Sequence, residues 1–86
     1  MPEIITVGEI LVEVMATRIG QKLSEPGEFV GPYPSGAPAI FIDQVARMDG
    51  DCGIISRIGQ DDFGKLNKNR LEDDGVDISN ILYTPD

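Results

Sequence analysis

The chain has 86 residues, of which 41% are hydrophobic and 26% charged, and 7 basic against 15 acidic residues give a net charge of −8. This balance argues against nucleic acid or an anionic membrane as the main partner, since both require a basic face. There is no histidine and one cysteine, Cys52, which excludes an intrachain disulfide, a Ser-His or Cys-His pair and a histidine metal site within the chain.

The first expected elements are two strands separated by a bend. Residues 4–7 form a β-rich apolar run, which predicts a strand buried on both faces of a parallel sheet. Gly8 is expected to mark the bend where the chain leaves that sheet. Residues 9–15 continue in strand-like residues, although they include the acids Glu9 and Glu13.

A punctuated segment and a helix start come next. The glycines and prolines of residues 17–34 favour loops with a short strand near residues 28–30. The run Pro34-Ser35-Gly36-Ala37-Pro38-Ala39 predicts a tight turn that opens a helix, with Ser35 as N-cap and Gly36 free to take a positive φ. The free N–H groups of such a turn suit a small-molecule site, but an ordinary loop-to-helix junction explains the same residues.

The first helix is predicted over residues 37–49. Residues 49–51 should stop it, with Gly50 at the C′ position. Its expected apolar stripe consists of Ile40, Phe41, Val45 and Met48. Ile42 and Ala46 should widen this stripe.

The second half repeats the pattern. Residues 53–59 predict a central strand, next to which Cys52 is expected to be a buried small residue. Asp61 or Asp62 should cap a second helix that ends at residues 73–75, before a third strand at residues 81–83. The buried face of this helix is expected to hold Phe63, Leu66 and Leu71.

Strand, helix, strand, helix and strand with short connections indicate an α/β fold with a parallel sheet. Three strands and two helices leave parts of the sheet uncovered, so we expect a truncated chain or one that needs a partner. Since no basic segment with an apolar core opens the chain and no apolar run approaches ~20 residues, we expect a cytoplasmic protein that does not enter the membrane.

Ligands of open parallel sheets bind beyond the carboxyl ends of the strands. Residues 9–13, 35–38 and 57–61 should gather there. Glu13 is the candidate acceptor for sugar or polyol hydroxyls, with a solvated strand acid as the alternative. Residues 59–64 hold two glycines and an acid pair, but they lack the spacing of a calcium loop, so a turn with a helix cap is expected and no metal site.

Taken together, these motifs resemble the amino-terminal portion of a ribokinase-like (PfkB family) carbohydrate kinase. The resemblance spans nearly the whole chain, as one portion of a single kinase domain at residues 1–86. The matching segments are residues 7–13, 31–48 (around Ser35-Gly36-Ala37-Pro38-Ala39), 55–64 and 71–77.

The resemblance implies an enzyme that transfers the γ-phosphoryl group of ATP, with Mg²⁺, to a sugar hydroxyl. It implies a Rossmann-like central domain and a small β lid over the sugar, with lid strands here at about residues 10–16 and 28–32, and a homodimer formed through the lid. By the same resemblance, the substrate-binding residues would be Glu13, Ser35, Gly36, Ala37 and Arg57.

Two departures from the family pattern stand out. The family has an asparagine that reaches the sugar where this chain has Ile40. The family's anion hole, catalytic base and nucleotide pocket lie in a carboxy-terminal part that these residues do not include, so no catalytic or cofactor-binding residue is assigned here and the chain alone should be inactive.

The sequence therefore predicts a sugar kinase, with fructose or 2-keto-3-deoxygluconate as the favoured substrate types and this chain supplying the sugar-binding and lid part. The alternatives are a non-catalytic fragment that binds sugar or a partner, and a remnant without function. The sequence leaves open which sugar is bound.

Overall fold

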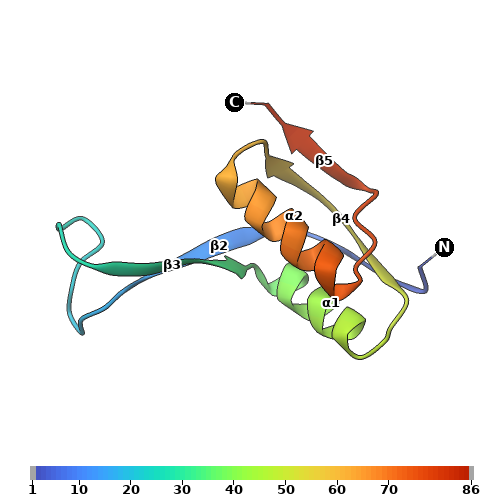
Figure 1. The fold of residues 1–86 in the computed structure, drawn as a ribbon, viewed down its shortest axis with the longest axis horizontal. Coiled ribbons are helices and arrows are strands. Elements are labelled where there is room, and N and C mark those ends of the chain that lie inside the picture. Colours follow the sequence, from blue (N-terminus) through green and yellow to red (C-terminus); the bar gives the residue numbers. More distant parts are fainter. Residues whose placement is uncertain (1, 86) are drawn as a thin grey trace.

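The computed structural model describes residues 2–85 and contains two sheets and two helices (Figure 1). Strands β1 (Ile4–Val7), β4 (Cys52–Gly59) and β5 (Ile81–Thr84) form a parallel sheet in the order β1-β4-β5. Strands β2 (Leu11–Ala16) and β3 (Phe29–Ser35) form an antiparallel hairpin that projects from the body as an arm. The expected α/β order, the parallel sheet and the strands of a separate small hairpin are all present.

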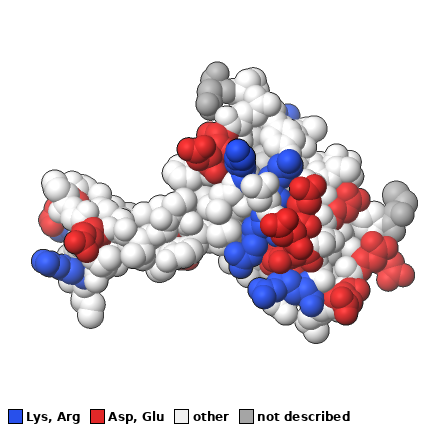
Figure 2. Space-filling model, viewed as in Figure 1, with Lys and Arg blue, Asp and Glu red and all other residues white. Residues whose placement is uncertain are grey.

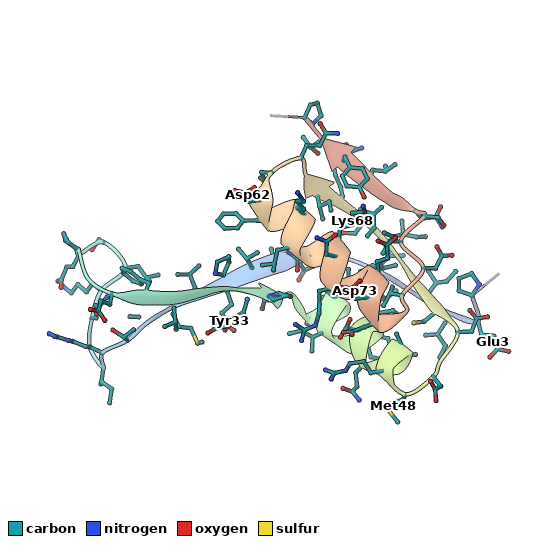
Figure 3. The ribbon with its side chains drawn as sticks, viewed as in Figure 1. Glu3, Tyr33, Met48, Asp62, Lys68 and Asp73 are labelled. Carbon is teal, nitrogen blue, oxygen red and sulfur yellow. The ribbon has the colours of Figure 1, made fainter. Side chains whose placement is uncertain are left out.

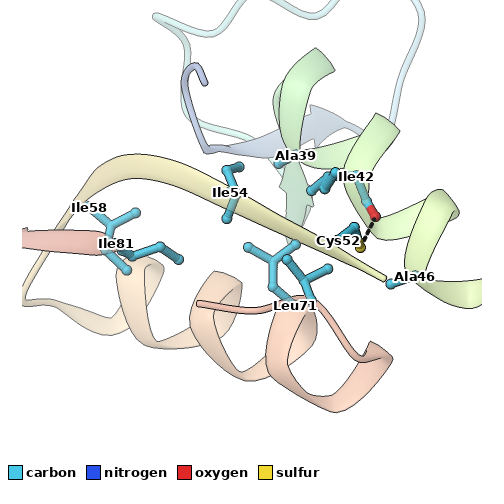
Figure 4. Close-up of a cluster of buried hydrophobic side chains, with 9 residues drawn as sticks. Ala39, Ile42, Ala46, Cys52, Ile54, Ile58, Leu71 and Ile81 are labelled. Atoms are coloured by element: carbon cyan, nitrogen blue, oxygen red, sulfur yellow. Dashed lines mark hydrogen bonds between the residues drawn. The ribbon is translucent and has the colours of Figure 1, made fainter. Parts of the chain in front are cut away.

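Helices α1 (Ala37–Arg47) and α2 (Asp62–Asp74) pack on one face of the parallel sheet and enclose its core (Figure 4). The central strand β4 turns every second side chain toward them, because side chains alternate along a strand. The buried core consists of Ala39, Ile42, Ala46, Cys52, Ile54, Ile58, Leu71, Val76 and Ile81.

The buried stripe of α1 differs from the predicted one. The helix buries Ala39, Ile42 and Ala46, whereas Ile40 is 58% exposed and Met48 is 73% exposed. Small side chains at Ala39 and Ala46 let the helix axis approach the sheet, so the face with less apolar area is the one that packs. Phe41 was also predicted to be buried and is exposed, while Val45 packs at the edge of the core.

The buried stripe of α2 was also predicted wrongly at one end. It consists of Gly64, Asn67 and Leu71, and Phe63 is exposed. Gly64 lies so close to the carbonyl oxygen of Gly59 that no side chain fits there. The predicted cap is confirmed, because Asp61 Oδ1 accepts a hydrogen bond from the Gly64 N–H at 2.8 Å.

Strand β1 is an edge strand that is not buried on both faces, contrary to the prediction. Val7 is 71% exposed and Ile5 is also exposed, since within residues 2–85 the helices cover only one face of the sheet. Gly8 does mark the bend, because β1 ends at Val7 and the chain enters the hairpin at Leu11. Cys52 is buried, as expected.

The C-terminal end of α1 uses a residue other than the predicted Gly50. Asp49 has a φ of 63° and takes the left-handed position. Its N–H donates to Ala46 O at 3.0 Å, and the Gly50 N–H donates to Val45 O at 2.9 Å. This pair of bonds is a Schellman motif with Asp49 at C′ and Gly50 one residue later. No helix within the described residues is long and apolar enough to span a bilayer.

Candidate sugar-binding site

The start of α1 is built on a glycine that the local geometry requires. Gly36 is the N-cap, with φ 98° and ψ 121°, and no side chain caps the helix. A Cβ on Gly36 would lie 2.9 Å from Glu9 O and 3.1 Å from Leu11 N. Ser35 was predicted as the N-cap, but it is the last residue of β3 and pairs with Leu11. The first-turn N–H groups of α1 therefore have no side-chain acceptor of their own.

Glu13 lies in β2, is exposed and pairs with Tyr33, which projects from the hairpin in Figure 3. It is two residues beyond Leu11, the partner of Ser35. Alternate residues of a strand share a face, and the rise of about 3.4 Å per residue separates the two pairs by roughly 7 Å. The hairpin thus places Glu13 and Ser35 on one face, with Ser35 next to the start of α1 and Glu13 further out along the arm.

A bulge follows Glu13, and the sequence reasoning missed the residue that permits it. The register of the hairpin shifts between Glu13 and Met15. Gly31 lies opposite with φ 128°, and a Cβ there would be 2.6 Å from Glu13 O. Bulges turn side chains away from the regular strand direction. The signal that could have indicated this bulge in the sequence was Gly31, which lies between an apolar strand residue and Pro32.

Arg57 and Ala37 complete the predicted set, but neither they nor Glu13 line the groove that contains Ser35. Arg57 is exposed on β4 and its Nη1 donates to Thr84 Oγ1 at 3.4 Å. By alternation with the buried Ile58, it belongs to the sheet face away from the helices. Ser35 lines a groove between α1 and α2, whereas Arg57 lines a different groove beside the start of β2. Ala37 is exposed in the first turn of α1.

Charged side chains of both signs gather over the two helices, while the middle of the hairpin arm is uncharged on the face drawn in Figure 2. Asp43 of α1 lines the groove that contains Ser35. The pKa of Asp43 is raised to about 6, first by burial and then by a hydrogen bond to the neighbouring Asp74 carboxyl and its charge. The charges of Arg70 and Arg47 act in the opposite direction.

The Asp43–Asp74 contact joins the two helices. Asp43 Oδ1 is buried and has no hydrogen-bond donor among the described residues. Arg70 Nε forms an ion pair with Asp74 Oδ2 at 3.2 Å. Ionised carboxylates only accept hydrogen bonds, so the two acids can bond each other only when one holds a proton. Nothing in the sequence reasoning linked these two acids.

Asn67 of α2 is the second polar residue that the sequence reasoning missed. Its side chain is buried, and its Nδ2 donates to Leu11 O and to Phe63 O, each at 3.2 Å. Within residues 2–85, no three His, Cys, Asp or Glu side chains are grouped as metal ligands.

Known proteins resemble this chain over nearly its whole length. No protein-family model matches the chain. Fructokinase-1 of Oryza sativa subsp. japonica is 34% identical over 80 residues, and 5-dehydro-2-deoxygluconokinase of Clostridium beijerinckii is 29% identical over 82 residues. These alignments cover 93% and 95% of this chain, but only 24% of each relative.

A solved structure with a closer match is that of an E. coli protein classed as ribokinase II. It is 58% identical and superposes with a TM-score of 0.94, over 99% of this chain and 27% of that one. The same protein has also been crystallised with ATP and Mg²⁺. The chain thus spans about a quarter of the length of the proteins that it matches. The resemblance expected from the sequence is confirmed: this chain is homologous to part of the ribokinase-like sugar kinases and shares their fold over that part.

Proposed function

We propose that this chain is the sugar-binding part of an ATP-dependent carbohydrate kinase. The acceptor would be a hydroxyl of a keto sugar or sugar acid, of the type of fructose or 2-keto-3-deoxygluconate. The observation that carries the proposal is the hairpin register, which places Glu13 and Ser35 on one face, with Ser35 beside the Gly36 N-cap. The relatives named as a fructokinase and a 5-dehydro-2-deoxygluconokinase support this substrate class.

The proposed contacts follow from hydrogen-bonding chemistry. The Glu13 carboxylate accepts hydrogen bonds from sugar hydroxyls, and the N–H groups of Ala37 and Ala39 at the start of α1 donate to sugar oxygens. Pro38 has no N–H to offer. Gly36 would contribute through its backbone, because Glu9 O and Leu11 N fill the space that a Cβ would take. Arg57 is a proposed contact from the sheet side that would require the hairpin to close toward the body.

ATP and Mg²⁺ belong to the proposal for the whole protein. Phosphoryl transfer depends on positioning and on stabilising charge at the phosphate oxygens. The resemblance implies that the catalytic groups lie in the carboxy-terminal part of such a kinase, so no catalytic step is assigned to residues 1–86. We expect the 86 residues alone to bind sugar without transferring phosphate.

Calorimetric titration of this chain with fructose and 2-keto-3-deoxygluconate, and with a nucleoside for comparison, tests the sugar site. Glu13→Gln removes the charged acceptor, so we expect sugar binding to weaken roughly 10-fold to 100-fold. Glu25→Gln, at an exposed acid on the far loop of the hairpin, should leave the affinity unchanged. Equal effects of the two substitutions would contradict the assignment of Glu13.

A non-catalytic sugar-binding or partner-binding function is the second candidate, and Ile40 favours it. The side chain at this position offers no hydrogen bond and lines the groove beside Ser35. Ile40→Asn should raise the sugar affinity about tenfold if the site is otherwise intact. Transfer of labelled phosphate from ATP by the full-length protein that carries this segment would decide for the kinase. Failure with every sugar of the panel would decide against it.

Two further parts of the proposal concern partners and location. We propose that residues 1–86 are the amino-terminal portion of one kinase domain, that two copies associate through the hairpin, and that the protein is cytoplasmic. The hairpin exposes apolar side chains on its two faces that such an interface would cover in part: Leu11, Val14, Met15, Phe29 and Val30. Sedimentation velocity should show a dimer, and a monomer at all accessible concentrations would contradict this part.

A further inference from the structure

One buried polar side chain connects the body of the molecule to the hairpin. Asn67 of α2 is 4% exposed, and the other side chains of the buried core are apolar. Its amide donates to Leu11 O, 56 residues away in the chain, and to Phe63 O one turn earlier in the helix. The first bond joins α2 to the residue at which β2 begins.

Packing alone would not select an amide at this position. Asn67 lies one turn before Leu71 on the buried stripe of α2, where an apolar side chain would need no partner. A buried amide must be hydrogen-bonded or it destabilises the fold. Asn67 meets this requirement by holding the backbone of Leu11 in place, so its bond fixes the point at which the hairpin leaves the body.

Position 67 also lies between the two grooves that contain predicted site residues. Asn67 lines the groove beside Ser35 and the groove beside Arg57. Leu11 pairs with Ser35, and Glu13 is two residues further along β2. A small change of the hairpin angle at Leu11 would therefore displace Glu13 relative to the start of α1.

We infer that Asn67 is a positioning residue, which sets the angle of the β2–β3 hairpin against the body and thereby the reach of Glu13 toward a bound sugar. Its role toward the sugar rests on the proposed function, whereas its role as an anchor of the hairpin rests on the hydrogen bonds alone. Residues that hold a binding group in place affect affinity although they do not touch the ligand.

Spin labels at Leu23→Cys and Met48→Cys test the anchor without any sugar. These positions are 77% and 73% exposed, and the natural Cys52 is only 2% exposed and should not react. Asn67→Leu keeps the branched shape, with a somewhat larger volume, and removes the donor. We expect it to broaden the distance distribution between the labels at least twofold. Asn69→Leu makes the same change at an exposed position of α2 and should leave the width unchanged.

Asn67→Ser is the second variant, in case the leucine variant does not fold. Its hydroxyl can bond to Phe63 O within the helix but cannot reach Leu11 O, so it removes only the link to the hairpin. It should broaden the distribution in the same way. An unchanged width in both variants would overturn the inference.

Sugar titration of the same variants tests the role of Asn67 toward the bound sugar. We expect about tenfold weaker binding for Asn67→Leu and Asn67→Ser, because both variants lose the bond to Leu11 O. Unchanged affinity in a broadened variant would overturn the positioning role. Absence of sugar binding by the wild-type chain would contradict the proposed function instead, while the label distances would still decide the anchor.

Discussion

The pair of acids between α1 and α2 should make the stability of this chain depend on pH in an unusual direction. Asp43 has a pKa of about 6 in the folded chain, against an ordinary value of 3.8. The folded state therefore holds a proton that the unfolded state releases between these two values. The stability contributed by this proton is fully present below about pH 4 and is lost as the pH rises through about 6.

The size of the effect follows from the shift. A difference of about two pKa units corresponds to at most about 3 kcal/mol. Asp43 borders a solvent-accessible groove, so screening should reduce the observable change to roughly 1–2 kcal/mol. Above pH 6 the ionised Asp43 carboxylate is repelled by the charge of Asp74, and the charges of Arg70 and Arg47 oppose this repulsion.

Asp43→Asn is the variant that isolates this effect. Its amide can donate to Asp74 at every pH, so above pH 6 the variant should be roughly 1–2 kcal/mol more stable than the wild type. Near pH 4 this gain should disappear. Urea unfolding, followed by circular dichroism at several pH values between 4 and 7.5, measures the free energy of unfolding of the variant and of the wild type. The contributions of the other acids cancel in the difference between the two.

Asp73→Asn is the matched control, since Asp73 is an exposed acid on α2. The difference in the free energy of unfolding between Asp73→Asn and the wild type should be small and should not change abruptly near pH 6. A difference in the free energy of unfolding between Asp43→Asn and the wild type that stays constant from pH 4 to 7.5 would refute the shared proton.

The ends of the helices carry two further predictions. Asp61→Ala removes the acceptor of the Gly64 N–H and should lower the free energy of unfolding by about 1 kcal/mol. Asp61→Asn keeps an acceptor oxygen and should retain most of this contribution. A loss of equal size in both variants would exclude capping as the cause. Asp49→Gly should raise the free energy of unfolding by about 0.5–1 kcal/mol in urea unfolding, because the positive φ of 63° favours glycine. Asp73→Gly, the same change inside a right-handed helix, should lower the free energy of unfolding by roughly 0.3 kcal/mol, and a loss of stability in both glycine variants would contradict this account of Asp49.

Local features of the sequence determined the order of the elements and several of their ends. The apolar runs around Thr6 and Ile54 identified strands, because a strand of a parallel sheet has a composition of its own. Asp61 identified the start of α2, because a cap bonds within one helical turn. The strands on both sides of the bend at Gly8 could likewise be predicted from their residues alone.

The faces of the helices and the polar links of the candidate site were decided by the tertiary structure. Ile40 and Phe41 are more apolar than Ala39 and Ala46, but the close approach of α1 to β4 selects the alanines. Ser35 suits an N-cap, yet pairing with Leu11 keeps it in β3.

The polar contacts near the candidate site join residues far apart in the chain. Asn67 reaches Leu11 across 56 residues, and Asp43 meets Asp74 from the neighbouring helix. Residue composition and periodicity report only on neighbours within a few turns of chain. Such links become determined only when the packing of the helices on the sheet brings their partners together.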